Sequence, residues 1–454
     1  MPHEHATAPW DRIEELLEQG DRNRLVAFAE ELGVRETARA LSRLEPEERD
    51  RVLTLLPPED AAEFIEEIPE EQAAALLGHL PTDKAAEILN EVDSNEAADV
   101  LGELDTDQAH EIIASMDPEE AQDARLLVRY EDDVAGGLMI TEYLAYPETA
   151  TVQEVIRDLQ INAEKYREYS VQYIYVTTNG QRLAGVLQLR DLLFRPATVC
   201  IADIMIAQPV CVRDDATLET LDELFEEEAF MGVPVTDAGG RLLGIIKRAD
   251  LEEGLAERAD DAYLKSQGIV GGEELRSMPT LRRSRRRLSW LSVNIVLNIV
   301  AASIIAMYQD TLAAVIALAV FLPMISDMSG CSGNQAVAVS IRELSLGLVK
   351  PFEIAHVWLK EISVGVLNGM VLGTLIGAVA FFWKGNPYLG LVVGAALAVN
   401  TMIAVSLGGT IPLVLRRLKV DPALASGPVL TTITDISGFS IVLTLATQLL
   451  PRLA

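Results

Sequence analysis

The sequence has few of the residues on which catalysis and metal cofactors usually depend. It contains three cysteines and five histidines among 454 residues. Cys200, Cys211 and Cys331 show no metal-ligand or redox spacing, which suits a reducing compartment. The histidines are scattered, and no nucleophile–base pair or phosphate-binding loop accompanies them. We therefore expect a protein that is not an enzyme.

Basic residues are scarce in the first part of the chain. Residues 1–281 carry 62 acidic and 24 basic side chains, whereas residues 282–454 carry 7 and 13. The acidic surplus argues against nucleic acid as a partner, because its phosphates would be repelled. It favours cations as partners, although solubility or a saline cytoplasm would explain it equally well. No long apolar run precedes residue 288, so we expect no cleaved signal peptide and a soluble N-terminal half.

Long apolar runs fill the remainder and predict five membrane spans. Basic residues cluster before the first span, between the second and third, and between the fourth and fifth. The positive-inside rule therefore places the N-terminus in the cytoplasm and the C-terminus outside, in a multi-pass protein of the cell (inner) membrane that contacts lipid. The expected spans are 288–308, 311–330, 362–382, 388–412 and 427–450.

A strict twelve-residue repeat runs through residues 44–116. Each unit has an apolar residue, then proline or an acid, then an alanine pair such as Ala61-Ala62, then an apolar pair. We expect the prolines in first helical turns and Asp93, Asp105 and Asp117 at helix N-caps. Such short units cannot fold alone, so the pattern predicts a helical solenoid with acids facing the solvent.

Residues 136–258 contain two copies of a strand–turn–strand–helix pattern. The expected strands are Val171–Val176 and Gly185–Leu189 around the turn Asn179-Gly180, and Val233–Thr236 and Leu242–Ile246 around Gly239-Gly240. The two copies resemble a pair of CBS (cystathionine β-synthase type) domains. Some CBS pairs bind adenine nucleotides through Ser or Thr three residues before Asp. Gln188 and Lys247 stand at those places, which argues against ATP as a cofactor.

Two carboxylates lie inside the apolar spans. Asp435 is in the last span and Asp327 is late in the second, with no Lys or Arg at comparable depth. Such residues usually face a cavity, a partner or a bound ion, so both are candidates for an ion pathway. Ser329–Gln335, which includes Asn334, is poor helix sequence and predicts unwound backbone that lines a pore. This setting suits Mg²⁺, which keeps its waters and is held by few carboxylates.

Two stretches carry a family resemblance. Gly330–Gln335, preceded by Pro323, and Asp421–Pro428, followed by Thr434-Asp435, resemble the second-span and last-span signatures of the MgtE family of magnesium channels. The similarity extends over nearly the whole chain in the same domain order. Cys331 and Asp327 depart from the family pattern, which usually has Asn and a small residue there.

The resemblance implies a homodimer whose interface holds the pore, with Asp435 beside hydrated Mg²⁺. It also implies a cytosolic Mg²⁺ sensor, and the matching acids are Glu227, Asp250, Asp260 and Asp261. The segment 262–287 matches the helix with which the family shuts the pore. Internal Mg²⁺ would bridge the acidic surfaces, favour a compact state and thereby close the ion's own route.

We therefore predict a multidomain α-helical membrane protein that acts as a Mg²⁺ channel gated by intracellular Mg²⁺. One alternative is an ion-coupled secondary transporter of Co²⁺, Mn²⁺ or a similar ion, with Asp327 as an extra titratable site. The other is a membrane-anchored sensor that transports nothing. The expected parts are a helical-repeat domain at 1–130, CBS domains at 131–200 and 201–261, a connecting helix at 262–287, and a five-helix pore domain at 288–454.

Overall fold

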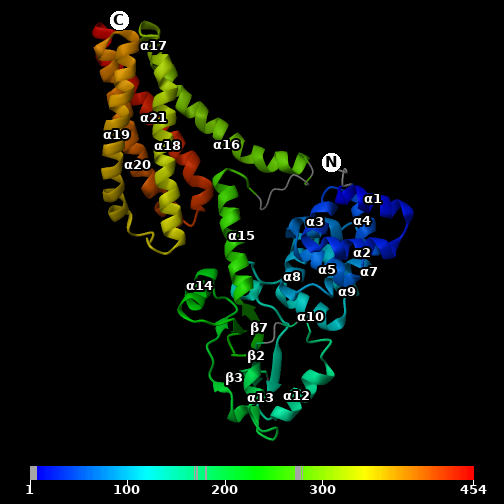
Figure 1. Cartoon of the computed structure of the whole chain (residues 1–454). Helices are drawn as coiled ribbons and strands as arrows, with labels where there is room; N and C mark the ends of the chain where they lie inside the picture. The colour runs from blue at the N-terminus through cyan, green and yellow to red at the C-terminus, as the bar shows by residue number, and fades with distance from the viewer. Residues whose placement is uncertain are drawn as a thin grey trace, which may run out of the picture. The chain divides into compact units, whose positions relative to one another are not determined.

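The structure, a computed structural model, describes residues 8–167, 169, 172–178, 181–270, 278 and 280–453. They divide into two compact units, Met1–Arg258 and Ala259–Ala454 (Figure 1). The strands all belong to the first unit, and the second is helical. The predicted fold class, helical repeats followed by a CBS-like pair and long apolar helices, is confirmed.

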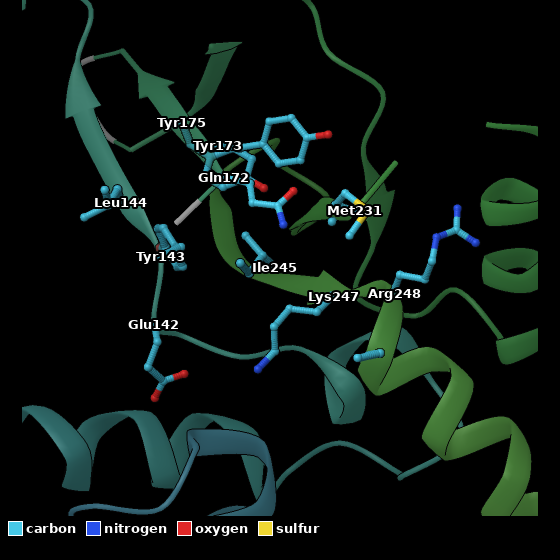
Figure 2. A pocket seen from close by; sticks show the side chains of 12 residues that line it. Glu142, Tyr143, Leu144, Gln172, Tyr173, Tyr175, Met231, Ile245, Lys247 and Arg248 are labelled. Atoms are coloured by element: carbon cyan, nitrogen blue, oxygen red, sulfur yellow. The ribbon is translucent and has the colours of Figure 1, made fainter. Parts of the chain in front are cut away.

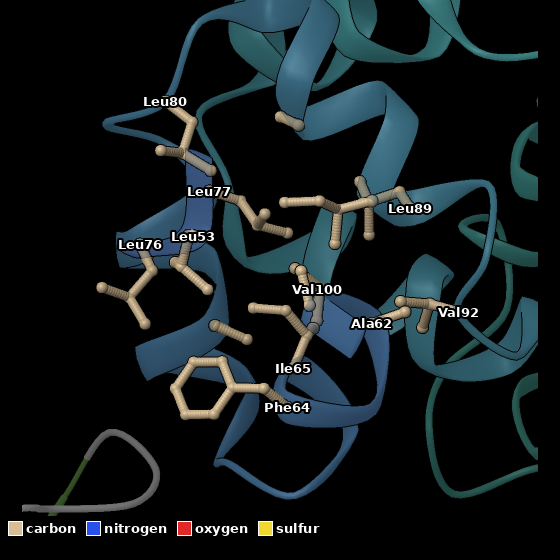
Figure 3. Close-up of a cluster of buried hydrophobic side chains, with 14 of the residues drawn as sticks. Leu53, Ala62, Phe64, Ile65, Leu76, Leu77, Leu80, Leu89, Val92 and Val100 are labelled. Atoms are coloured by element: carbon tan, nitrogen blue, oxygen red, sulfur yellow. The ribbon is translucent and has the colours of Figure 1, made fainter. Parts of the chain in front are cut away.

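Ten short helices begin the first unit. The repeats that begin at Leu56, Ile68, Leu80 and Val92 each bury an alanine pair and the apolar pair that follows, as in Ala61-Ala62 with Phe64-Ile65. Figure 3 shows these side chains meeting in one core. The helices are α1 (Pro9–Gln19), α2 (Arg22–Leu32), α3 (Val34–Leu41), α4 (Pro46–Leu55), α5 (Pro58–Glu66), α6 (Glu70–Leu77), α7 (Thr82–Leu89), α8 (Ser94–Glu103), α9 (Thr106–Ser115) and α10 (Pro118–Leu127).

The repeat predicts the helix starts well but the capping chemistry less well. Asp93, Asp105 and Asp117 occupy N-cap positions as expected, yet none of their side chains accepts a capping hydrogen bond. Two of their backbone N–H groups instead donate to side chains from earlier in the array. Asp93 N donates to Glu66 Oε1 at 3.0 Å, and Asp117 N donates to Asn90 Oδ1 at 3.1 Å. These contacts join α5 to α8 and α7 to α10, in each case three repeats apart.

Two small sheets follow. Their strand orders are β1-β2-β3-β4 and β5-β6-β7, each with a parallel pair followed by an antiparallel hairpin. Both hairpins shift register at matching points, Val176/Thr177 and Val235/Thr236, so the predicted internal duplication is confirmed. The strands are β1 (Leu144–Pro147), β2 (Tyr173–Thr177), β3 (Leu183–Gln188), β4 (Ile206–Ala207), β5 (Val212–Arg213), β6 (Gly232–Thr236) and β7 (Leu242–Lys247).

Short helices flank these strands. The expected Gly239-Gly240 turn forms, and Gly240 adopts φ 77°, a conformation that favours glycine. The other expected turn, Asn179-Gly180, lies outside the described residues. The helices are α11 (Ala135–Leu138), α12 (Val152–Ile161), α13 (Leu189–Leu193) and α14 (Leu218–Glu227), with a 3₁₀ turn at Ile201–Asp203.

The predicted connecting helix at 262–287 is divided in the structure. Helix α15 (Arg248–Ser266) begins directly after β7 and ends near Gly268, whose φ is 79°. Helix α16 begins at Thr280, and its first turns contain five arginines, Arg282, Arg283, Arg285, Arg286 and Arg287. Residues 271–277 and 279 lie outside the described part of the chain. The described ends of the segment thus belong to two different helices.

Five long helices make up the second unit. Four are long and apolar enough to cross a membrane: α16 (Thr280–Met307), α19 (Ile354–Lys384), α20 (Pro387–Arg417) and α21 (Pro422–Gln448). The fifth, α18 (Leu318–Ser345), packs against α20 and α21. It contains many Ser, Gly and other polar residues. Short helices α17 (Gln309–Ala314) and α22 (Leu450–Leu453) complete the unit.

Two expectations for the second span are wrong. The predicted span 311–330 is broken after Ala314, and the helix resumes at Leu318 and continues to Ser345. The predicted unwinding at Ser329–Gln335 does not occur, because this stretch is helical throughout. Its small residues serve close packing: a Cβ on Gly408 of α20 would lie 2.2 Å from the Gly333 carbonyl oxygen. Tertiary packing here outweighs the low helix propensity of glycine.

This packing gives a first prediction. Gly408→Ala should lower the stability of the protein, because overpacking a close contact typically costs about 1–3 kcal/mol. Gly427→Ala in α21 is the matched control, since a Cβ at Gly427 has no heavy atom within 4 Å. Thermal unfolding of both variants in detergent measures the difference. Equal melting temperatures would contradict the close approach of α18 and α20.

Candidate functional site

Asp435 lies in the middle of α21 and is buried, with 8% of its surface exposed. The Ser326 hydroxyl, from α18, donates a hydrogen bond to Asp435 Oδ1. None of the ion pairs formed by the described residues includes Asp435. An ionised carboxylate among apolar helices needs compensation, and one hydroxyl is a weak partner for a full charge. The position therefore has the chemistry of a cation site.

A buried amide lies beside this carboxylate. Asn400, from α20, is fully buried and contacts both neighbouring helices. Its Nδ2 donates to Ser329 Oγ at 2.5 Å and to the Thr434 carbonyl at 3.1 Å. Its Oδ1 accepts a hydrogen bond from Ser437 Oγ at 2.5 Å. These partners come from distant parts of the chain, so the sequence alone does not group them around Asn400.

The other predicted pore residues lie on one face of α18. Asp327, Cys331 and Asn334 are spaced by four and three residues, so they share a helix face, and all three are exposed in this single chain. Asp327 directly follows Ser326, the hydrogen-bond partner of Asp435, in the chain. This sequence neighbourhood is its link to Asp435. The exposed stripe is polar, which is unfavourable against lipid. It therefore requires water, an ion or another protein surface.

The first unit holds a second candidate site, on its acidic side. Lys247 Nζ lies 2.9 Å from Asp93 Oδ2 in the helical repeats and 3.6 Å from Asp250 Oδ1 at the start of α15. The Lys247 N–H also donates to Asp250 Oδ2 at 3.2 Å. A lysine thus bridges the repeat array and the second CBS-like unit. Asp93 and Lys247 are far apart in the sequence, so this bridge could not be predicted from it, although the missing hydroxyl at position 247 was noted.

Further carboxyl groups of the first unit are buried, and some of them lie close enough to act on this lysine. Burial raises the pKa of Glu96 to about 8, that of Asp99 to about 9 and that of Glu142 to about 7. Burial also raises the pKa of Asp250 to about 6, although Lys247 opposes the shift. Ser94 Oγ donates to Glu142 at 2.9 Å, again linking the repeats to the sheets. These raised pKa values keep Glu96 and Asp99 largely protonated at neutral pH in the folded unit.

The four predicted sensor acids have different surroundings. Asp250 is the half-buried partner of Lys247, whereas Glu227 at the end of α14 is exposed. Asp260 is exposed on α15, and Asp261 pairs with Lys265 at 2.5 Å. Lys265 also lies 3.7 Å from Asp421, the N-cap residue of α21. Among the described residues no three His, Cys, Asp or Glu side chains converge to hold a metal ion.

A cavity of about 140 Å³ opens between the two CBS-like units (Figure 2). Tyr173, Tyr175, Met231, Lys247 and Arg248 are among its lining residues. The Tyr175 hydroxyl is buried and has no hydrogen-bond partner in the described structure. The cavity adjoins the lysine bridge, because Lys247 and Glu142 belong to both.

Comparison with known families matches three segments of the chain. A family model described as MgtE, divalent cation transporter, matches residues 322–445. A model of the MgtE intracellular N domain matches residues 11–133, and a CBS domain model matches residues 201–257. The magnesium transporter MgtE of Thermus thermophilus is 37% identical over 330 residues, which is 72% of either chain. The chain belongs to the MgtE family.

The chain is also similar to a second curated relative and to two solved structures. The magnesium transporter MgtE of Bacillus subtilis is 33% identical over 72% of either chain. A crystal structure of the cytosolic domain of the Mg²⁺ channel MgtE in complex with ATP is 35% identical, with a TM-score of 0.49, over 54% of this chain and 99% of that one. The soluble part of a magnesium transporter is 26% identical over 55% of this chain and 98% of that chain, also with a TM-score of 0.49. As a member of the MgtE family, the chain has the divalent cation transporter domain on the segment that contains Asp435.

The buried acids of this MgtE-family chain predict a pH-dependent stability. A carboxyl group with a raised pKa binds more protons when folded than when unfolded, so its contribution becomes less favourable as pH rises from the unfolded value through the folded one. For Glu96 that window runs from the ordinary value of 4.5 to about 8. In the presence of a metal chelator, Glu96→Gln should therefore raise the melting temperature at pH 8 and change it little at pH 5. Equal effects at both pH values would contradict the raised pKa.

Proposed function

We propose that this MgtE-family protein carries Mg²⁺ across the cell membrane and that Asp435 lines the ion path. The single observation that supports this most strongly is the buried Asp435 carboxylate with only a hydroxyl partner. A passing hydrated cation would supply the missing positive charge. Mg²⁺ suits the site because it retains its waters and needs few direct protein ligands. The names of the curated relatives support the same ion.

We further propose a homodimer, with the exposed α18 face between the two chains. Asp327 and Asn334 would then face a shared aqueous path together with Asp435. A second copy would also cover the Cys331 side chain, which is exposed in the single chain. The basic residues that flank the spans support a cytoplasmic N-terminus and an outward C-terminus.

The proposed regulation uses the acidic first unit as a sensor of internal Mg²⁺. Burial and neighbouring carboxylates keep Glu96 and Asp99 protonated near neutral pH, and divalent cations would displace these protons, compensate the ionised carboxylates and so favour a compact arrangement. Asp250 would contribute together with the bound Lys247, while Glu227, Asp260 and Asp261 would contribute as solvent-accessible ligands. Lys265 connects Asp261 to Asp421 at the start of the helix that carries Asp435. This link supports a coupling of the sensor to the pore.

ATP is not part of the proposal. Gln188 and Lys247 still replace the two hydroxyls, and the Lys247 ammonium is already engaged by Asp93 and Asp250. A nucleotide phosphate in the adjoining cavity would compete with those carboxylates for the same cation and would face the buried acids around it.

An ion-coupled secondary transporter is the second candidate, favoured by the exposed Asp327. Coupling would require a driving ion at this additional carboxylate. Mg²⁺ uptake into proteoliposomes without any second-ion gradient distinguishes the two functions. Uptake that persists supports a channel, and uptake that requires the gradient and is lost in Asp327→Asn supports coupling.

The decisive test of the proposed ion path is Asp435→Asn. We expect Mg²⁺ uptake by the reconstituted protein to fall at least about tenfold, which corresponds to about 1.4 kcal/mol, because the amide lacks the charge that attracts the ion. Asp310→Asn, at an exposed aspartate of α17, is the matched control and should transport like the unmodified protein. Unchanged uptake by Asp435→Asn would refute the assignment.

The lysine bridge gives a separate prediction about regulation. Lys247→Met should raise the internal Mg²⁺ concentration that half-closes the pore by about fivefold, the change expected for about 1 kcal/mol from a partly exposed ion pair. Without the ammonium, Asp93 and Asp250 repel one another and the compact state needs more bound cation. Lys84→Met is a matched control, because Lys84 pairs only locally with Glu87. Patch-clamp recording at varied internal Mg²⁺ measures the shift, and identical curves would exclude a regulatory role for the bridge.

A further inference from the structure

The three hydrogen bonds of Asn400 join it to α18 and α21, the two helices that carry Ser326 and Asp435. On α21, Asn400 binds the Thr434 carbonyl, directly before Asp435, and the Ser437 hydroxyl, two residues after it. On α18, it binds Ser329, which is one helical turn from Ser326. One amide therefore holds the helix turns that present the Asp435 carboxylate and its hydroxyl partner.

The Ser329 hydroxyl extends this connection to the backbone of α18. Ser329 Oγ accepts from Asn400 and lies 3.0 Å from the Ser326 carbonyl oxygen and 2.6 Å from that of Ile325, to which it can donate. Ser329 is fully buried. It cannot touch a passing ion, so any influence on transport must act through the position of Ser326.

Gly438 makes room for the amide. A Cβ at this position would lie 2.7 Å from Asn400 Nδ2, closer than real Cβ contacts occur. The glycine three residues after Asp435 is thus explained by the approach of Asn400 and not by backbone conformation, because α21 is helical there. The site and its support form one packed arrangement of α18, α20 and α21.

We propose that Asn400 is a positioning residue that fixes Asp435 relative to Ser326 and thereby sets the discrimination between Mg²⁺ and larger divalent cations. This inference rests on the proposed role of Asp435. Mg²⁺ requires near-octahedral water at 2.0–2.1 Å, whereas Ca²⁺ accepts irregular shells at 2.3–2.6 Å. A carboxylate and a hydroxyl held at one separation fit one hydrated ion. A site that is free to move accepts both.

The test compares Mg²⁺ and Ca²⁺ influx into proteoliposomes for the unmodified full-length protein, Asn400→Leu and Ser329→Ala. We expect the Mg²⁺ to Ca²⁺ flux ratio to fall by about fivefold in Asn400→Leu, the equivalent of about 1 kcal/mol of lost discrimination. Ser329→Ala, which removes one bond of the network, should lower the ratio in the same direction by a smaller factor. Asn298→Leu is the control, because Asn298 is an exposed asparagine of α16, and it should keep the original ratio.

A purely structural role predicts a different result. If Asn400 only holds the helices together, its loss reduces the amount of active protein and lowers both fluxes equally, so the ratio stays constant. Gly438→Ala is an independent test of the same geometry. It keeps the Asn400 residue, but the added Cβ would displace the Asn400 amide group from its present position. If Asn400→Leu fails to fold, Ser329→Ala and Gly438→Ala decide the question. Unchanged ratios in these folded variants would overturn the inference.

Asp435→Asn, measured in the same proteoliposome assay, separates this inference from the proposed function. Normal transport by Asp435→Asn would refute the ion path and the positioning role together. Loss of transport in Asp435→Asn, combined with unchanged ratios in the other variants, would refute the positioning role alone.

Discussion

The protein depends on keeping a carboxylate among apolar helices. Asp435 is buried between α21 and α18, where the Ser326 hydroxyl is its hydrogen-bond donor. The surrounding helices must approach closely enough to hold it, and glycines such as Gly333 and Gly408 allow that approach. Asn400 then joins the three helices through buried hydrogen bonds, which are electrostatically stronger in the protein interior than in water. Packing and ion chemistry are therefore parts of one arrangement.

In the acidic first unit the constraint is different, because many carboxyl groups lie close together. Burial and the crowding of negative charge raise the pKa values of Glu96, Asp99 and Glu142 to about 8, 9 and 7, so Glu96 and Asp99 are largely protonated at neutral pH. Lys247 offsets part of this charge by bridging Asp93 and Asp250, and the remainder is available to cations from solution. A surface that gains stability from the transported ion is suited to report the concentration of that ion. The proposed feedback follows from this property.

Periodicity predicted the architecture well. The twelve-residue repeat, the duplicated hairpins and the long apolar runs each reflect local spacing, and the corresponding elements formed near the expected positions except at the second apolar run. Asp435 was found because a charged residue in an apolar run is conspicuous. The continuous helix through Ser329–Gln335 was missed, because propensity could not show that Gly333 packs against α20. The bridging roles of Lys247 and Asn400 could not be predicted for the same reason. Their partners, Asp93 and Ser437 among them, are far away in the sequence.

A density map of the full chain in lipid nanodiscs, recorded with Mg²⁺ present, tests the central claim most directly. The account predicts that Asp435 faces a water-filled path and that density for a hydrated ion lies beside its carboxylate, with the Ser326 contact retained. An Asp435 side chain directed at lipid, or enclosed by protein without access to any aqueous path, would contradict it.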